Sequence, residues 1–404
     1  MPPANDRPGR VAHSSRLGDG REVAAYPGDA PLPDDVRRFF DAHAATNVEL
    51  RHEWFSLLTQ CIPGLASQAR YLVLRDADGC AAVWPVLVGR EAGALSNYFS
   101  ALYAPAHRPG LVVADLVPLA HLLRRQAGHA PTYRFAPMDP QAQAFLLLEQ
   151  TLRATGLLTS RYYRFGNWYL PTAGLDWDRY FADRPGELRN TVRRTRARFS
   201  QAGGTLELVS DRAALDRGIA AYEQVYAASW KEREPYQGFV SSLVRLCAEQ
   251  GWLRLGIAWL DGRPIAAQIW IVAFGRAEIF KLAYDNDFRR FSPGTLLTTM
   301  LLKHCIEQDR VQEVDYLIGD DDYKSAWMTH RRERWGLVAH DPRTLRGALG
   351  ALGQTLSAGF HAGMRALGLP DGRRLRPGEA QAHGRPAGLP QQHRTATPCA
   401  RRKP

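Results

Sequence analysis

Residues 285–297 have the composition of an anion-binding helix start. Ser is preferred at a helix N-cap and Pro at the first helical position, so Ser292 and Pro293 predict that a helix begins here. The first turn of a helix leaves N–H groups without intrahelical partners, and the helix dipole adds positive charge, so this turn suits a phosphate or pyrophosphate. The predicted donors are the backbone groups of Gly294, Thr295 and Leu296.

Residues beside this helix start favour the same chemistry. Gly294 lacks a side chain and would let a ligand approach the backbone closely. Arg289 and Arg290 add positive charge upstream, and Asp285 is a carboxylate that could accept a proton. The alternative is a capped helix that binds nothing, because Ser-Pro-Gly is typical of helix starts.

A second cluster follows the predicted strand 313–318. The carboxylates Asp320–Asp322 precede a short helix that carries Tyr323, Lys324 and Trp327. A phenol and an ammonium beside a strand end could protonate a leaving group or stabilise an oxyanion. The alternative is structural, because acidic residues stabilise a helix N-terminus and side chains four residues apart pack on one face.

A third cluster ends a long predicted helix. Tyr226 is followed by Trp230, Lys231 and Glu232, which combine an aromatic ring, a cation and a carboxylate. The alternative is a polar helix end with Trp230 as its anchor in the core.

The elements that must position these clusters occur twice along the chain. Asp78-Gly79 and Asp261-Gly262 mark two hairpin turns that lie 183 residues apart. The same order of helices, three strands, helix and strand surrounds each turn, which indicates a duplicated α/β unit. The predicted strands are 71–75, 81–88, 95–103, 132–136, 161–170, 205–210, 253–260, 264–273, 277–284, 313–318 and 336–339. The predicted helices are 34–44, 53–61, 115–126, 141–155, 186–200, 211–230, 240–250, 293–308 and 323–328.

Length and charge define the domains. The 404 residues exceed one ordinary core, so we expect a flexible lead-in (1–30), a first domain (31–175) and a second domain (176–342). They are followed by an amphipathic helix (343–369), whose leucine-rich stretch 345–367 either docks on the protein or contacts a membrane surface, and by a disordered basic tail (370–404). Of the net charge of +11, residues 371–404 carry +6, so basicity is mostly a property of the tail and no specific nucleic-acid partner is expected.

The cysteines and the N-terminus limit the remaining classes. Five scattered cysteines without metal-ligand spacing predict neither a disulfide framework nor a zinc site, and no metal is expected. The N-terminus lacks an apolar signal segment, which favours a cytoplasmic protein, at most peripheral to the inner membrane face.

Several motifs of the second half occur together: Leu188-Arg189-Asn190, Ser229-Trp230-Lys231, Gly262 to Ala267, Ala283-Tyr284-Asp285, Ser292 to Leu297, and Asp315 to Trp327. With them, residues 180–338 resemble the GNAT superfamily, in its cellulose and exopolysaccharide biosynthesis branch. That branch is similar to FemAB-type aminoacyl transferases, which carry two tandem GNAT-like domains. The resemblance implies an α/β fold in which each domain is a mixed, mostly antiparallel sheet flanked by helices. Where the family's phosphate loop usually has two glycines, this chain has only Gly294.

The resemblance also implies a mechanism. Acetyl-CoA or another acyl-CoA would bind between strands 277–284 and 313–318, with its pyrophosphate at the donors named above and near Arg290 and Ser292. Lys324 would stabilise the oxyanion, and Tyr323 would protonate the departing thiolate. The candidate bases are Glu232, Asp285 and Asp320.

The acceptor is expected to be a primary amine of a small polar molecule or an amino sugar. Aromatic rings stack well on sugars, so we expect Tyr98, Trp168, Trp230 and Trp327, with Lys231, to shape its site. Two alternatives remain: a FemAB-like transferase that uses charged tRNA, and a GNAT-like module without catalysis that binds a glycan, a membrane surface or a protein.

Overall fold

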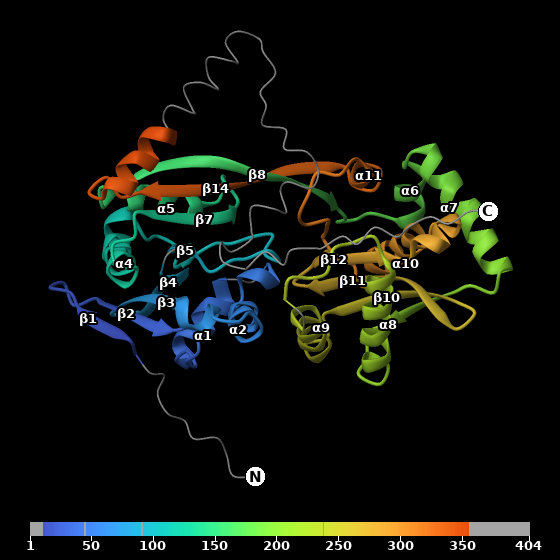
Figure 1. Ribbon diagram of the computed structural model, residues 1–404, viewed down its shortest axis with the longest axis horizontal. Coiled ribbons are helices and arrows are strands. Elements are labelled where there is room, and N and C mark those ends of the chain that lie inside the picture. Colours follow the sequence, from blue (N-terminus) through green and yellow to red (C-terminus); the bar gives the residue numbers. More distant parts are fainter. Residues whose placement is uncertain (1–10, 44–45, 90–91, 237, 355–404) are drawn as a thin grey trace, which may run out of the picture.

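The computed structural model describes residues 11–43, 46–89, 92–236 and 238–354. The predicted basic tail and residues 355–369 lie outside this part of the chain. Strands from both halves form one sheet in the order β1-β2-β3-β4-β5-β7-β14-β8-β13-β12-β11-β10-β9, with β6 paired to β4 (Figure 1). Its antiparallel pairs outnumber its two parallel ones, β5 with β7 and β12 with β13.

The first half comprises β1 (His13–Arg16), β2 (Glu22–Pro27), α1 (Asp34–His43), η1 (Val48–Leu50), α2 (His52–Cys61), α3 (Leu65–Gln68), β3 (Ala69–Asp76), β4 (Gly79–Leu87), β5 (Ala92–Ala94), β6 (Ala106–His107), α4 (Val113–Gln126), β7 (Thr132–Met138), α5 (Gln143–Ala154) and β8 (Leu158–Pro171). The lead-in prediction was wrong for its described part, because β1 and β2 add to the sheet there. The buried run from Val23 to Tyr26 explains their place in the core. The predicted strand 95–103 is instead a loop after β5.

The second half comprises α6 (Trp177–Ala182), α7 (Gly186–Gln201), β9 (Thr205–Val209), α8 (Leu215–Ala228), α9 (Phe239–Glu249), β10 (Leu253–Leu260), β11 (Arg263–Ala273), β12 (Arg276–Tyr284), η2 (Asn286–Phe291), α10 (Pro293–Glu307), β13 (Glu313–Asp315), α11 (Asp322–Ser325) and β14 (His330–His340). Alternate residues of β10 pack on opposite sides. Leu255 and Ile257 join the core that includes α8 and α9, whereas Ala258 and Leu260 pack with the start of α10. The sheet therefore separates α8 from α10.

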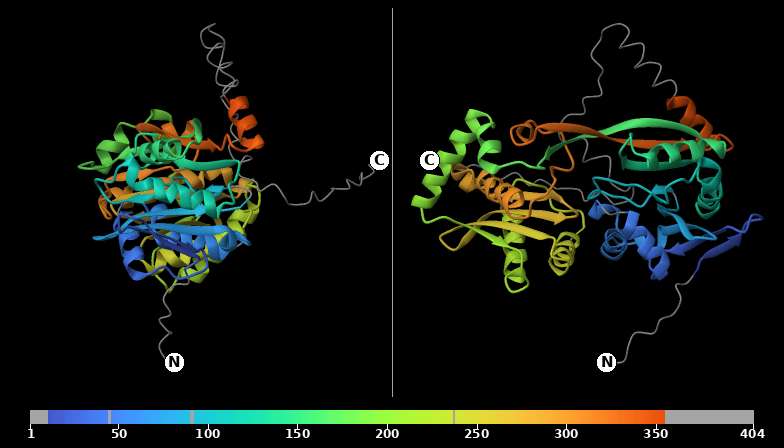
Figure 2. Two further views of the ribbon diagram at one scale, coloured as in Figure 1. Left: turned by 90° about the vertical axis from the view of Figure 1, so that its left-hand side faces the viewer. Right: turned by 180° about the vertical axis from the view of Figure 1, so that it is seen from behind.

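The two halves exchange their last strands. β8 of the first half pairs with β13 of the second, and β14 of the second half pairs with β7 of the first. β8 and β14 pair with each other along their length and run across both halves (Figure 1), as the view from behind also shows (Figure 2). The sequence predicts a strand only over 336–339, within the second domain. The charged first part of β14 is a strand because Arg331 and Arg332 form ion pairs with Asp320 and Asp315.

A helix over 345–354 follows β14. Two of its three glycines face the protein: a Cβ at Gly350 would lie 2.7 Å from His340, and one at Gly347 would meet the Asp341 carbonyl. On the opposite side Leu345, Leu349 and Leu352 are 57–78% exposed. This part of the predicted amphipathic helix thus packs through its small residues and leaves its leucines in solvent. Within the described residues, no helix combines the length and apolar character needed to cross a membrane.

Candidate functional site

The site predictions converge where β12 and β13 diverge. The two strands are parallel neighbours only from Arg276 to Glu278, opposite Glu313 to Asp315. Beyond that point β12 continues to Tyr284 with β11 on its other side, whereas the chain after β13 turns away through positive φ angles at Leu317 (53°) and Gly319 (107°). The predicted strand 313–318 is therefore shorter than expected, and β12 has a free edge beside the start of α10.

The start of α10 carries no side-chain cap. Ser292 occupies the predicted N-cap position, but its φ of 47° and ψ of 50° are left-handed and its side chain makes no cap hydrogen bond. The Leu296 N–H donates to the Ser292 carbonyl (3.2 Å), so Leu296 is not a free donor as predicted; its side chain lies in the core. The half-exposed amides of Gly294 and Thr295 remain for a ligand. Capping, the structural alternative, does not consume them.

Buried polar groups fix this helix start. The Gln268 side chain of β11 donates to the Gly294 carbonyl (2.8 Å) and to Thr298 (2.9 Å), and accepts from Trp270 (2.9 Å). A Cβ at Gly294 would meet only Tyr284, at 3.7 Å, so the space in front of this residue is open. Arg290 is exposed, lies over the Phe291 ring (4.8 Å), and is held through its carbonyl by Arg198 of α7.

Lys324 is buried at the opposite side of the divergence. Its ammonium donates to the Ile318 carbonyl (2.6 Å) and the Gly319 carbonyl (3.3 Å) and pairs with Asp321 (3.2 Å). Burial lowers the pKa of Lys324, and the carboxylate of Asp321 opposes this shift. The lysine therefore holds the turn after β13 in addition to any role toward a ligand.

Tyr323 and Lys324 both pack against the ring of Tyr316. Tyr316 packs edge-on against Tyr323 (5.8 Å between centroids) and lies under the Lys324 ammonium (5.5 Å). Partial burial, with Tyr316 and Asp321 nearby, raises the pKa of Tyr323, so its phenol stays protonated at neutral pH. A neutral phenol is the form that a proton donor requires.

A group of six residues, here called the junction cluster, lies where the two halves meet: Tyr98, Tyr222, Tyr226, Lys231, Glu234 and Lys281. Lys281 of β12 pairs with Glu234 (2.8 Å) and lies over the Tyr98 ring of the first half (5.2 Å). Tyr98, Tyr226 and Lys231 were named from the sequence, whereas Tyr222, Glu234 and Lys281 were missed. The available signal was Lys281 itself, a cation in an otherwise apolar strand segment.

The predicted bases differ in their surroundings. Asp285 is buried, accepts the Asp287 N–H (3.0 Å) and pairs with Arg263 (2.6 Å), so it caps η2. Asp320 pairs with Arg331, which holds the pKa of Asp320 below its ordinary value. Asp320 is therefore a weak base, and Asp285 would have to give up Arg263 and its cap of η2 to act as one. Glu232 is exposed, and its carbonyl accepts from Tyr226 (3.0 Å).

The predicted aromatic residues divide into two groups. Trp327 is 4% exposed within a core cluster, where its carbonyl accepts from Tyr180 (2.6 Å), so the structure contradicts its predicted place in the acceptor site. Trp168 packs against the same core. Trp230 is 52% exposed and its ring lies 4.6 Å from Tyr284, beside Gly294. Of these three tryptophans, only Trp230 is available to a ligand near α10.

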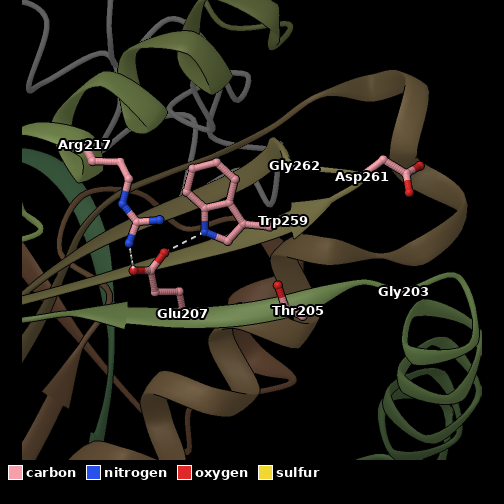
Figure 3. A pocket seen from close by; sticks show the side chains of 7 residues that line it. All are labelled: Gly203, Thr205, Glu207, Arg217, Trp259, Asp261 and Gly262. Carbon is pink, nitrogen blue, oxygen red and sulfur yellow. Dashed lines mark hydrogen bonds and ion pairs between the residues drawn. The ribbon is translucent and has the colours of Figure 1, made fainter.

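A separate hollow lies between the edge strand β9, α8 and the β10–β11 turn (Figure 3). Glu207 is its central polar group, accepting from Trp259 (2.7 Å) and pairing with Arg217. It contains none of the predicted site residues. In the first half, Asp41, His52 and Glu53 could in principle hold a cation, but Arg51 pairs with both carboxylates (3.3 and 3.0 Å).

The second half is similar to a known protein family. Residues 186–325 match the family model described as an acetyltransferase (GNAT) domain. This segment is similar to a GNAT acetyltransferase domain. The match supports an acyltransferase, and the predicted fold class of two tandem GNAT-like domains is confirmed. No curated protein matches the chain.

Solved structures share the fold at low sequence identity. FemX has a TM-score of 0.55 and 14% identity, covering 80% of this chain and 98% of FemX. A conserved protein of unknown function from Bacteroides thetaiotaomicron VPI-5482 has a TM-score of 0.52 and 10% identity, covering 76% and 96%. Such likeness extends the shared fold over both halves and does not define a substrate.

Proposed function

We propose that the second half transfers an acyl group from acyl-CoA, acetyl-CoA in the simplest case, to the primary amine of a small polar or amino-sugar acceptor. The observation that carries the proposal is the uncapped start of α10, with two available amides, beside the free edge of β12. The donor pyrophosphate would bind Gly294 and Thr295, supplemented by Arg289 and Arg290. The thioester would then lie between β12 and the Lys324 turn.

The reaction requires one proton acceptor and one proton donor. A carboxylate takes one proton from the acceptor ammonium, the neutral amine forms the new C–N bond, and the C–S bond breaks. The second proton of the amine nitrogen passes to the Tyr323 phenolate, which forms when Tyr323 protonates the thiolate. Tyr323 gives its proton to the departing thiolate, whose thiol has a pKa of roughly 8.5. Lys324 would stabilise the oxyanion by releasing one of its carbonyl partners.

Glu234 is our preferred base, with Glu232 as the alternative. Apart from its ion pair with Lys281, the buried carboxylate of Glu234 makes no hydrogen bond among the described residues. Each of the three carboxylates would give up an ion pair on protonation. The partners of Asp285 and Asp320 are arginines, which stay charged, whereas the partner of Glu234 is Lys281, whose pKa burial lowers.

Isothermal titration of the full chain with acetyl-CoA and with a longer acyl-CoA tests the donor site. We expect micromolar binding that Gly294→Val abolishes, because the valine would fill the space that the phosphate needs. Gly353→Val is the matched control, since a Cβ there meets nothing within 4 Å. Unchanged affinity in Gly294→Val would exclude the α10 start. Binding without transfer to any amine would favour the non-catalytic alternative.

A charged-tRNA donor is the second candidate. Arg189, Arg193 and Arg196 line a hollow on the exposed side of α7, the helix that packs beside η2 and α10. Such a row of cations suits a nucleic-acid backbone. Charged tRNA binding that weakens steeply with salt and in Arg193→Glu, without acyl-CoA binding, would favour this candidate.

The exposed leucines of the 345–354 helix suggest where in the cell the enzyme acts. We propose that these leucines contact a membrane surface on the cytoplasmic side, where an exopolysaccharide pathway would use the enzyme. Flotation with anionic vesicles should recover the protein, and Leu349→Glu should remove it from the lipid fraction. Equal flotation of both proteins would contradict the contact.

A further inference from the structure

The junction cluster contains an ammonium without a counter-ion. Lys281 pairs with Glu234 (2.8 Å), and Lys324, which lies nearby, pairs with Asp321 (3.2 Å). Lys231 makes no ion pair among the described residues, and its ammonium lies 6.0 Å from the centre of the neighbouring Trp230 ring. Two of the three ammoniums thus have a counter-ion within the described part of the chain, and Lys231 has none there.

The surroundings of Lys231 disfavour its charge. Burial lowers its pKa to about 8, Lys281 and Lys324 add to the effect, and Glu234 and Asp321 oppose it. A half-buried cation without a partner is destabilising until an anion supplies the missing charge. An anionic ligand would therefore gain more here than at an exposed lysine.

The rest of the junction cluster supplies hydrogen-bond donors. The Tyr222 hydroxyl is buried and has no hydrogen-bond partner among the described residues. Burial and the nearby Glu234 raise the pKa of Tyr98, so its phenol remains protonated, whereas the Tyr226 hydroxyl already donates to the Glu232 carbonyl (3.0 Å). A buried polar group left without a partner calls for an explanation, and a bound ligand is one.

The cluster also adjoins the proposed donor site. Trp230 precedes Lys231 and packs on Tyr284, which is the residue nearest to Gly294. On the other side, Lys281 lies over Tyr98 and Phe99 of the first half (5.2 and 4.9 Å). A ligand on Lys231 would therefore lie between the α10 start and the first half.

We propose that Lys231 binds an anionic oxygen group of the acceptor, so that the acceptor is an amine that also carries a phosphate or a carboxylate. This inference rests on the proposed acyl transfer and narrows its substrate class. The acceptor's amine would face Glu234, and its acidic group would pair with Lys231. A neutral amino sugar would leave Lys231 without a counter-ion.

Binding of matched amines to the full chain, measured without any acyl donor, tests the inference. The probes are glucosamine 6-phosphate against glucosamine, and lysine against cadaverine; each pair differs by one acidic group. In at least one pair we expect the acidic member to bind about tenfold tighter, as one ion pair of this kind provides. The pair that discriminates identifies phosphate or carboxylate. Equal or absent binding within both pairs would overturn the inference.

Three variants assign the discrimination to Lys231. Lys231→Gln should abolish it and Lys231→Arg should retain it. Lys303→Gln, which removes the same charge from the exposed part of α10, should leave it unchanged. Discrimination that survives in Lys231→Gln would also overturn the inference. Acyl-CoA affinity, measured separately, distinguishes the two proposals: its absence contradicts the donor site, whereas its loss in Lys231→Gln alone would place Lys231 in the donor site.

Chemical labelling gives a readout that does not depend on the choice of amine. The sequence has only five lysines, so acetic anhydride labelling of each can be followed by mass spectrometry. Glucosamine 6-phosphate or inorganic phosphate should protect Lys231 and leave Lys303 reactive. Equal reactivity of Lys231 with and without both anions would count against an anion site.

Discussion

The two halves place a helix at the same point of the sheet order, α4 between β5 and β7 and α10 between β12 and β13, but the helices begin differently. At α4 the Asp115 carboxylate accepts the Val112 N–H (2.9 Å) and pairs with Arg21 (3.0 Å). At α10 no acidic residue lies in the first turn and Ser292 does not cap it. One helix start is thus occupied by a carboxylate of the protein, and the other is open.

This difference teaches that a first-turn carboxylate and a bound anion compete for the same positive helix start, although Asp115 accepts the Val112 N–H and not the amides that correspond to those of Gly294 and Thr295. Asp115 stabilises α4, and it would repel a pyrophosphate placed there. The open start of α10 forgoes that stabilisation. We infer that the two halves have different roles. The second half binds the acyl donor, and the first half contributes Tyr98 to the junction cluster.

Copying the α4 arrangement into α10 gives the largest expected effect. Thr295 occupies the third helical position, as Asp115 does in α4, so Thr295→Asp places a carboxylate at the donor site. Acyl-CoA affinity should fall about 100-fold or more, because like charges brought together in a binding site cost several kcal/mol. Thermal stability should hold or rise. Thr295→Asn is the matched control in calorimetry, and an unchanged affinity in Thr295→Asp would remove the contrast between the halves.

The second-largest effect is expected from replacing Lys324, which lies on the other side of the divergence of β12 and β13. Lys324→Met should lower kcat about 100-fold, as loss of an oxyanion donor does, and change the donor KM little. Some loss of thermal stability should accompany it, because the ammonium also binds the Ile318 and Gly319 carbonyls. Lys303→Met is the control. A lower melting temperature with unchanged kcat would make Lys324 purely structural.

A carboxyl pair at the junction predicts a pH effect on stability. Glu49 of the first half and Glu278 of the second are both buried, and Asn47 donates to Glu278 (3.1 Å). Burial raises the pKa of Glu278 from 4.5 to about 7, and that of Glu49 is also raised, by burial and by Glu278. The folded state therefore binds protons more tightly, and stability is lost as pH rises from 4.5 to about 7.

Replacing the second carboxyl measures this linkage. Glu278→Gln keeps an acceptor for Asn47 and should flatten the fall of melting temperature between pH 4.5 and 7. The variant should be more stable than the wild type at pH 8. Glu307→Gln on α10 is a control outside the junction. An unaltered pH profile in Glu278→Gln would show that the pair does not govern this dependence.

The smallest effect comes from opening the start of α4. Asp115→Ala should destabilise the protein by about 1 kcal/mol, a usual figure for a lost helix cap. It should not create acyl-CoA binding, because the first turn of α4 has no glycine through which a phosphate could approach the backbone. Denaturant unfolding and titration measure the two quantities. A protein with both Asp115→Ala and Gly294→Val could still bind acyl-CoA. That result would show that the cap at α4 is what prevents the first half from binding the donor.

Local signals predicted more than distant ones did. Ser292 and Pro293 marked the start of α10 correctly, since N-terminal preferences depend on neighbouring residues. The missing cap could not be predicted, because it follows from the left-handed backbone of Ser292. Trp327 was wrongly assigned to the acceptor, as an aromatic residue in the core looks the same in sequence.

Contacts between the halves were beyond prediction. The ion pair of Lys281 with Glu234, and the place of Lys281 over the Tyr98 ring, depend on how the two halves join. Likewise, the charged residues 330–335 form a strand only because their partners lie in distant segments. No periodicity within one segment carries that information.

The exchange of β8 and β14 has a consequence for synthesis on the ribosome. The first half lacks the strand that pairs with β7 until residues 330–340 have been made. At roughly 5–20 residues per second, the ribosome needs on the order of 10–40 s to extend the chain from the end of β7 to that strand. During this interval the edge of β7 is open to incorrect pairing, so a nascent chain that stalls before β14 is exposed to aggregation and to capture by chaperones.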